Sequence, residues 1–446
     1  MWTTVNYFLH RKSSPVLPSY HCLKSLSQSF ATFFSDKIHK LHTNLLLKAN
    51  YCSPHIDPPS NPVNLSNFQP VTLDEISKLL SQSPATDSDL DPIPTSLLKQ
   101  CACVLLPTIT NIINLSLSSG TFPDQFKSCS VHPLLKKPNL DKEILGNYRP
   151  ASHLSFLSKL IERIVKNRHM DHLSSYKLLN SFQSAYLKSH STETALLSVH
   201  DHIIRAMSLQ QITCLCLLDL SAAFDTIDHS ILIHRLTSWF GINGSVLSWL
   251  KSYLSNRSFY VNLTGTKSSI FQLLYGVPQG SVLGPLLFIL YTTPLSHIIS
   301  KSASNHHLYA DDTQLYMSFS PNYFSSNITH LEGTISISSI NDGCMLIVSH
   351  LTLIRLNFSS YVILNSFLNL IILHYHFLTM SHFLQLNLLV ILVSYLILIF
   401  LSLITYLLFL NLVYIISVIS NVSEVLLISL LHVRIIAMHC PYSFYA

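Results

Sequence analysis

The chain has 446 residues, of which 48% are hydrophobic and only 11% charged, and it carries a net charge of +5. Ordinary soluble domains contain about 25% charged residues, so the composition argues against an average soluble protein. The charges are also unevenly spread, because residues 345–446 hold only Arg355, Glu424 and Arg434 and contain no glycine. Two kinds of sequence therefore share one chain. The weakly basic charge permits a nucleic-acid partner without requiring one.

The nine cysteines are scattered along the chain. The close pairs Cys101/Cys103 and Cys214/Cys216 lack the C-x-x-C spacing that is typical of zinc sites and redox motifs. We therefore expect no zinc and no disulfide framework, and a reducing compartment fits the cysteine content.

In chain order, the first 52 residues predict a polar helical stretch, with Phe30 and Phe34 at near-helical spacing. Four prolines between positions 54 and 62 predict a linker. A helix is expected to begin after Thr72, with Thr72 as N-cap and Glu75 three residues further on as its capping-box partner. The later elements are helices over 101–118, 154–170, 229–240, 245–255 and 281–299, a strand over 212–220, a hairpin around Gly265, and two short strands within 307–318.

Three aspartates stand where the predicted elements end. Asp219 closes the apolar strand, and Asp311 and Asp312 lie in the turn between the two short strands. Buried carboxylates are costly unless they are paired, and two divalent ions about 3.5–4 Å apart can stabilise the attacking and leaving oxygens of a phosphoryl transfer. Taken alone, the Asp-Asp pair is more typical of a solvated turn.

A glycine-flanked segment, Gly276–Pro285, lies between these aspartates and runs into a predicted helix. Such a loop lets the backbone approach a ligand closely and directs N–H groups at it. The same pattern also fits a simple hairpin exit followed by a helix start.

Together, these segments resemble the reverse transcriptases of non-LTR (LINE-type, jockey-like) retrotransposons. The resemblance covers roughly residues 30–335. The segments that carry it follow one another in the order of that family: His132–Pro138, Asn147–Pro150, His190–Leu196, Leu218–His229, Gly276–Pro285 and Tyr309–Asp312.

The resemblance implies an α+β fold with the fingers and palm of a right-hand polymerase, the palm being a small antiparallel sheet backed by helices. A hydrophobic helical tail, whose fold the pattern leaves open, would follow. The expected segments are a connector and linker (1–70), a helical extension (71–125), fingers and palm (126–340) and the tail (341–446). The implied function is that of an RNA-directed DNA polymerase with an RNA template, a DNA primer and dNTPs as partners.

The resemblance also implies the roles of particular residues. Asp219 and Asp311 would hold two Mg²⁺ ions, or Mn²⁺, with Asp312 as a supporting carboxylate. Phe224 would be the steric gate against a 2′-hydroxyl, although a core phenylalanine is the simpler interpretation of that residue alone. The remaining implied residues are Arg149, Lys136 and Lys137 at the triphosphate, and Gln279 and Gly280 at the template and the nascent base pair.

Among the departures of the chain from the family, two concern the polymerase itself. Tyr186-Leu187 stands where an aromatic-Arg pair is usual, and no lysine follows Lys301, where the family has the late palm and the thumb. We therefore expect an impaired polymerase, with an inactive nucleic-acid-binding remnant as the alternative.

The hydrophobic tail has two interpretations. We favour translation of T-rich DNA in a shifted frame over a membrane anchor through Leu386–Ser420, which is 35 residues without a charge. The cytoplasm or the nucleus is expected for the parent element, and a membrane if the tail is an anchor.

Overall fold

The computed structural model describes residues 16–48, 63–85, 88–220, 222–302, 304–323, 326–331, 333–334 and 348–356. Positions 44–48, 219 and 348–356 are described by their backbone. The chain divides into two compact units, residues 1–373 and 374–446, and every described residue lies in the first. The expected membrane segment 386–420 therefore falls outside the described residues.

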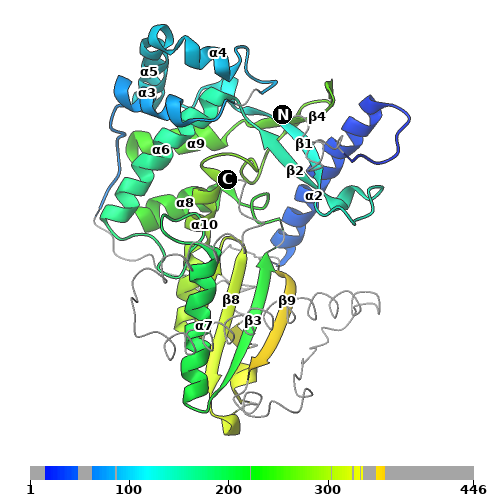
Figure 1. Ribbon diagram of the computed structural model, residues 1–446, viewed down its shortest axis with the longest axis vertical. Helices are drawn as coiled ribbons and strands as arrows, with labels where there is room; N and C mark the ends of the chain where they lie inside the picture. Colours follow the sequence, from blue (N-terminus) through cyan, green and yellow to red (C-terminus); the bar gives the residue numbers. More distant parts are fainter. Residues whose placement is uncertain are drawn as a thin grey trace, which may run out of the picture. The chain divides into compact units, whose positions relative to one another are not determined.

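The fold is of mixed α+β type, with helices above and beside two separate sheets (Figure 1). Its helices are α2 (Leu23–Lys48), α3 (Leu73–Gln82), α4 (Thr95–Gln100), α5 (Ala102–Ser119), α6 (Phe156–Ser175), α7 (Thr192–Ser208), α8 (His229–Phe240), α9 (Gly244–Leu254) and α10 (Gly284–Lys301). Its strands are β1 (Ser128–Leu135), β2 (Tyr148–His153), β3 (Ile212–Leu220), β4 (Ser258–Leu263), β5 (Thr266–Lys267), β6 (Phe271–Gln272), β7 (Asn305–Tyr309), β8 (Asp312–Phe319) and β9 (Val348–Leu356). Short 3₁₀ turns cover Asp124–Phe126, Leu145–Asn147 and Pro321–Tyr323.

The first sheet has the strand order β2-β1-β4-β5, and β6 pairs with β4. Strands β1 and β2 are antiparallel, whereas β1 and β4 are parallel. Helix α2 packs on this sheet, since Phe30 is fully buried and its ring meets that of Tyr148 edge-on at 5.0 Å. The predicted N-terminal helix is therefore part of the core of the first sheet.

A large hydrophobic core joins helices α3, α5, α6, α8, α9 and α10. Trp249 of α9 is fully buried there and meets Phe122 edge-on at 5.3 Å. Caps fix two of the predicted helix ends: Thr72 accepts a hydrogen bond from the Glu75 N–H, and Gly120 ends α5 with φ +65°. The predicted capping box forms only in part, because the Glu75 carboxylate binds Arg168 at 2.7 Å. Each cap supplies partners for backbone groups that the helix itself leaves unpaired.

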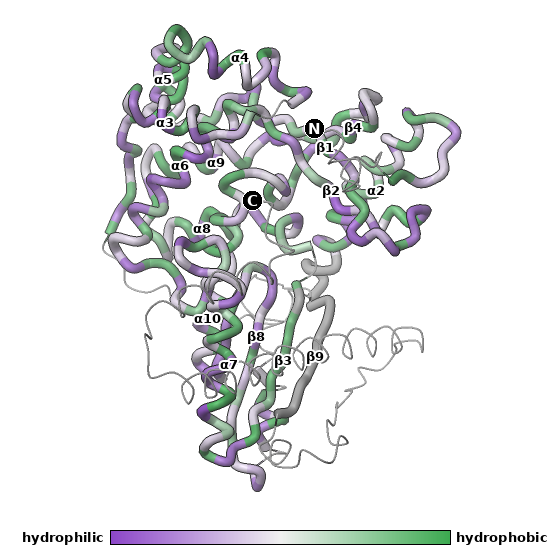
Figure 2. The backbone as a smooth tube through the Cα atoms, viewed as in Figure 1, coloured by the Kyte–Doolittle hydropathy of each residue, from purple (hydrophilic) through white to green (hydrophobic). Residues whose placement is uncertain are grey.

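The second sheet is antiparallel, in the order β7-β8-β3-β9. Strand β3 is hydrophobic along most of its length (Figure 2). Both of its edges are paired, with β8 and β9, and its residues Ile212, Cys214, Cys216 and Leu218 are buried on one face. The predicted strand over 212–220 has the observed bounds. Helix α7 contacts β3, β7 and β8, and α10 contacts β7.

The structure differs from the sequence prediction at the start of the expected tail. Val348–Leu356 was predicted to belong to a helical tail, but it forms strand β9 and pairs with β3 from Thr213 to Leu220. The helical prediction is wrong for these residues because a run rich in Val, Ile and Leu suits a sheet position as well as a helix.

Among the described helices, α5 is the one with the length and apolar composition of a membrane span. Its residues Ile109, Ile113 and Leu117 are buried in the helical core, whereas Val104 and Leu115 are exposed. Helix α5 therefore packs one apolar face against the helical core of the protein.

Candidate active site

The three sequence-predicted aspartates meet at one end of the second sheet. In the β3–β8 pair, the backbone of Asp219 lies directly opposite that of Asp312. Tyr309 pairs with Asp312 across a two-residue turn that consists of Ala310 and Asp311. Asp312 is exposed and Asp311 is half-buried. Strand pairing thus gathers Asp219, Asp311 and Asp312 at one corner of the sheet, the carboxylate corner, although 92 positions separate Asp219 from Asp311 in the sequence.

The Asp-Asp turn is held from a neighbouring segment. Buried Gln183 accepts hydrogen bonds through Oε1 from the N–H of Ala310 at 3.1 Å and from that of Ala185 at 2.9 Å. Ala310 has φ +55°, which residues with a Cβ rarely adopt and which other contacts must therefore stabilise. The Gln183 contact supplies part of that support.

The glycine loop is joined to the segment that leaves β3. The N–H of Gly276 donates to the Ile227 carbonyl at 2.8 Å, and that of Val277 donates to the Phe224 carbonyl at 2.9 Å. A Cβ at Gly276 would lie 2.6 Å from the Phe224 carbonyl oxygen, closer than real contacts allow. Glycine is therefore required here because the two backbones touch.

The glycine loop also touches β2 of the first sheet. The N–H of Ser152 donates to the Gln279 carbonyl at 2.9 Å, and the Gln279 amide donates to Asp225 Oδ1 at 2.9 Å. Burial raises the pKa of Asp225, and the Gln279 hydrogen bond and the charge of Lys37 act in the opposite direction. Gln279 thus links the strand β2 to the segment that follows β3.

A buried carboxylate anchors the end of the glycine loop. Oε2 of Glu162, a fully buried residue of α6, accepts hydrogen bonds from the N–H groups of Val282 at 2.7 Å and Leu283 at 3.1 Å. The Ser158 hydroxyl donates to Oε1 at 3.1 Å. Burial raises the pKa of Glu162, while these donors and the charge of Arg257 favour its ionised form. The carboxylate therefore stabilises the N-terminal end of α10.

Phe224 is half-buried at the exit of β3. Its ring lies 5.0 Å from that of Phe288 in α10 and 6.5 Å from that of Tyr186. Tyr186 has φ +62°, and its hydroxyl is close enough to Asp311 for the charge to act on it. Burial, with a smaller effect of Asp311, raises the pKa of Tyr186 to about 12. Phe224 therefore has one face in the core and lies beside a tyrosine that borders the carboxylate corner.

The cationic side chains that were predicted to bind the triphosphate lie on the β1–β2 hairpin rather than at the carboxylate corner. Arg149 is exposed on β2, opposite Leu134, and Lys137 is exposed just beyond β1. The Lys136 ammonium donates to the Gly146 carbonyl at 2.9 Å. Burial, and then the charge of Lys37, lowers the pKa of Lys136.

Residues 135–337 match the protein family described as reverse transcriptase (RNA-dependent DNA polymerase). Among curated proteins, the chain is 30% identical over 270 residues to the "Probable RNA-directed DNA polymerase from transposon BS" of Drosophila melanogaster. It is 32% identical over 253 residues to the "RNA-directed DNA polymerase from mobile element jockey" of the same organism. Both relatives confirm the likeness to LINE-type elements that the sequence motifs indicated.

The alignments cover 59% and 54% of the chain but only 30% and 27% of these two relatives. The chain thus matches less than a third of the length of either one. The likeness extends to the "Probable RNA-directed DNA polymerase from transposon X-element" at 29% identity over 233 residues.

Three residues of the reverse transcriptase domain and its N-terminal helix were missed as site residues by sequence reasoning: Gln183, Glu162 and Lys37. Glu162 stands off the apolar face of the predicted helix over 154–170, where a polar residue is ordinary. Lys37 lies in the segment Phe33–Ile38, which also resembles the family but gave no role for it. The charge of Lys37, on α2, acts on both Asp225 and Lys136.

Proposed function

We propose that this chain is the polymerase core of a LINE-type mobile element and extends a DNA primer on an RNA template. The observation that carries the proposal is the pairing of Asp219 with Asp312 beside Asp311, with the glycine loop bound to the segment that leaves the same strand. In this proposal the first sheet with α2 corresponds to the fingers, and the second sheet to the palm. The match to the reverse transcriptase family supports this assignment.

The donor set of the carboxylate corner suits the implied metal. Asp219 and Asp311 offer the hard oxygen ligands that Mg²⁺ prefers, and Mn²⁺ accepts the same ligands. Two such ions would stabilise the attacking 3′-oxygen and the leaving pyrophosphate. Asp312, on the exposed side of the turn, would add negative charge that favours cation binding.

The other proposed roles belong to Phe224, to the glycine loop and to cations of the β1–β2 hairpin and α2. Phe224 would limit the space beside the sugar, and Gln279 and Gly280 would lie against the template and the nascent base pair. Arg149, Lys136 and Lys137 would bind the triphosphate, because guanidinium and ammonium groups donate strong hydrogen bonds to phosphate oxygens. Lys37 would join them from α2.

We further propose that extension is weak. Positioning supplies much of the rate of phosphoryl transfer, and phosphate contacts supply much of the affinity for a duplex. Residues 345–446 offer only Arg355 and Arg434 for such contacts. An inactive remnant that binds a primed template without extending it is the second candidate, because Tyr186-Leu187 replaces a usual arginine-bearing pair.

The test is primer extension by the full chain on a primed homopolymeric RNA with labelled dTTP and Mg²⁺ or Mn²⁺. Asp311→Asn should remove the product, with a loss of roughly 10²-fold or more, since it removes a preorganised charge. Asp201→Asn is the control, since Asp201 forms an ion pair with Arg205 at 2.8 Å in which both side chains are exposed. Product that is equal for wild type and Asp311→Asn would refute the polymerase. Binding of the primed template without any product would establish the remnant.

A further inference from the structure

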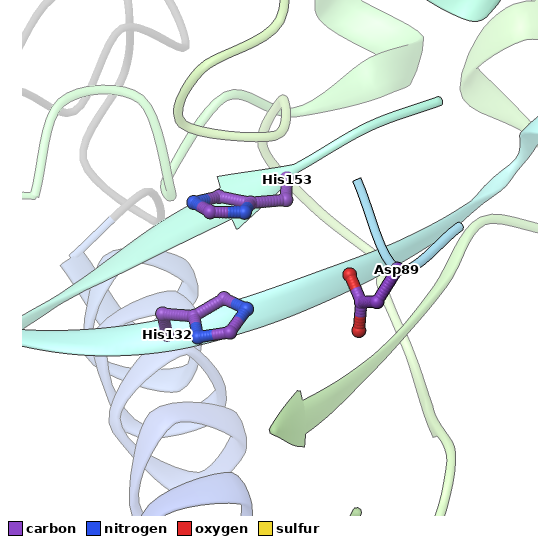
Figure 3. A group of neighbouring side chains, drawn as sticks. All are labelled: Asp89, His132 and His153. Atoms are coloured by element: carbon purple, nitrogen blue, oxygen red, sulfur yellow. The ribbon is translucent and has the colours of Figure 1, made fainter. Parts of the chain in front are cut away.

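A second group of cation-binding side chains lies in the first sheet, outside the carboxylate corner. Asp89, His132 and His153 bring one donor atom each to within 4.8 Å of one another (Figure 3). They come from three separate segments: a loop before α4, strand β1 and the last residue of β2. The two histidine rings lie 4.4 Å apart, centroid to centroid, with their planes inclined by 33°.

The strand register explains why the two histidines meet. In the β1–β2 pair, Ser130 lies opposite His153 and His132 lies opposite Ala151. His132 and His153 are therefore diagonal neighbours, and alternate residues of a strand project from the same face. The register, rather than closeness in sequence, brings together two imidazoles that are 21 positions apart.

The carboxylate of the group is oriented by its own donors. Asp89 Oδ2 accepts hydrogen bonds from the Asn262 amide at 2.6 Å and from the Ser130 hydroxyl at 3.0 Å. Partners that orient a ligating carboxylate in this way are a regular part of metal sites. Ser130 Oγ also lies 3.4 Å from His132 Nε2, so one hydroxyl borders two members of the group.

We propose that Asp89, His132 and His153 bind one divalent transition-metal ion, with Zn²⁺ as the fitting probe. Two imidazole nitrogens and one carboxylate oxygen form a donor set that suits Zn²⁺ and its neighbours, whereas Mg²⁺ prefers oxygen ligands alone. This site is separate from the aspartates of the proposed polymerase reaction.

The separation of the donors is compatible with a single ion after small movements. Ligand atoms around a tetrahedral ion with bonds of about 2.0–2.1 Å lie about 3.4 Å apart. The exposed His153 side chain can rotate to close a gap of this size, while the Asn262 and Ser130 donors keep the Asp89 carboxylate in place. The cysteine spacing excludes a cysteine-based zinc site, whereas these two histidines come together only through the pairing of β1 and β2.

A bound ion would fasten the loop around Asp89 to two strands of the first sheet. The ion would also lie near the glycine loop, because His153 follows Ser152, whose N–H donates to the Gln279 carbonyl. We therefore expect the ion to stabilise the β2 end that contacts this loop. This consequence does not depend on polymerase activity.

The test is titration of the full chain with Zn²⁺ by calorimetry, and with Co²⁺ by its visible absorption. We expect one site per chain that is weakened at least tenfold by His153→Ala and by His132→Ala. His200→Ala is the matched control, because His200 is an exposed histidine of α7 outside the group, and it should leave that site unchanged. Equal titrations for wild type and all three variants, or no saturable site in the wild type, would overturn the proposal.

A second measurement uses the wild-type chain and so does not depend on the folding of a variant. Diethyl pyrocarbonate modifies accessible imidazoles, and mass spectrometry locates the modified residues. Zn²⁺ should slow the modification of His132 and His153 severalfold while leaving that of His200 unchanged. Equal rates with and without Zn²⁺ at all three positions would contradict the site.

Discussion

Asp219 and Asp312 are direct cross-strand partners at the end of the antiparallel pair β3–β8. Partners in such a pair have Cα atoms about 4.5–5.5 Å apart, and like charges directly opposite each other destabilise a sheet. The fold thus pairs two aspartates across strands, a position where like charges are unfavourable. An arrangement that costs stability and concentrates negative charge suits cation binding.

Gly280 is expected to tolerate a side chain worse than Gly265 does. Both have positive φ, +113° and +91°, but a Cβ at Gly280 would lie 2.6 Å from the Ser152 carbonyl oxygen, whereas nothing lies within 4 Å at Gly265. Gly265→Ala should cost about 1–2 kcal/mol for backbone strain alone. Gly280→Ala should cost clearly more, as measured by chemical denaturation. Equal losses for both variants would show that the loop does not press on β2.

Glu162 should stabilise the loop through its two backbone donors. Glu162→Ala leaves the N–H groups of Val282 and Leu283 without this partner. The variant should lower the free energy of unfolding by about 1–3 kcal/mol for each of these buried donors. Glu162→Gln keeps an acceptor and should restore most of the stability. As a control, Glu193→Ala in the exposed first turn of α7 should lower the free energy of unfolding by less than about 1 kcal/mol. Similar losses for Glu162→Ala and Glu193→Ala would contradict the anchoring role.

Phe224→Val should relax the choice of sugar. Removing the ring would open space at the exit of β3, so ribonucleotide incorporation relative to deoxyribonucleotide should rise by roughly tenfold to 200-fold. Phe182→Ala serves as the control, because this partly exposed ring packs on His306 at 4.3 Å and not on Phe288. The ratio is measured by primer extension with each nucleotide in turn. A ratio unchanged in Phe224→Val would assign Phe224 to the core alone.

Stability should fall as the pH drops below 6.5. Burial lowers the pKa of His169 and of His306 from 6.5 to about 4 in the folded chain. Above pH 6.5 both imidazoles are neutral in the folded and in the unfolded chain. Between pH 6.5 and about 4 they bind protons in the unfolded chain but not in the folded chain, so the unfolded chain is favoured. Each histidine can lower the free energy of unfolding by up to about 3 kcal/mol across this pH range. His306→Gln should make the denaturation midpoint fall less between pH 7 and pH 5. An unchanged dependence of the midpoint on pH would show that His306 does not contribute to the decline.

The sequence predicted the elements well where local signals were strong. Thr72 and Gly120 marked helix ends because caps depend on neighbouring residues, and the apolar run of β3 gave its bounds. The candidate site was predictable through motifs whose spacing is read along the chain. Gln183, Glu162 and the group of Asp89, His132 and His153 were not, because they act through contacts between distant segments. No local pattern distinguishes such residues from ordinary surface or helix residues.

Strand β9 gives β3 a neighbour on its second edge. Without it, the backbone N–H and C=O groups of an apolar strand from Ile212 to Leu220 would face outward on one side. An exposed, long, hydrophobic edge recruits strands from other molecules and leads to aggregation. A shortened chain that ends before Val348 should therefore self-associate, whereas one that ends after Leu356 keeps the edge covered and sheds most of the hydrophobic tail.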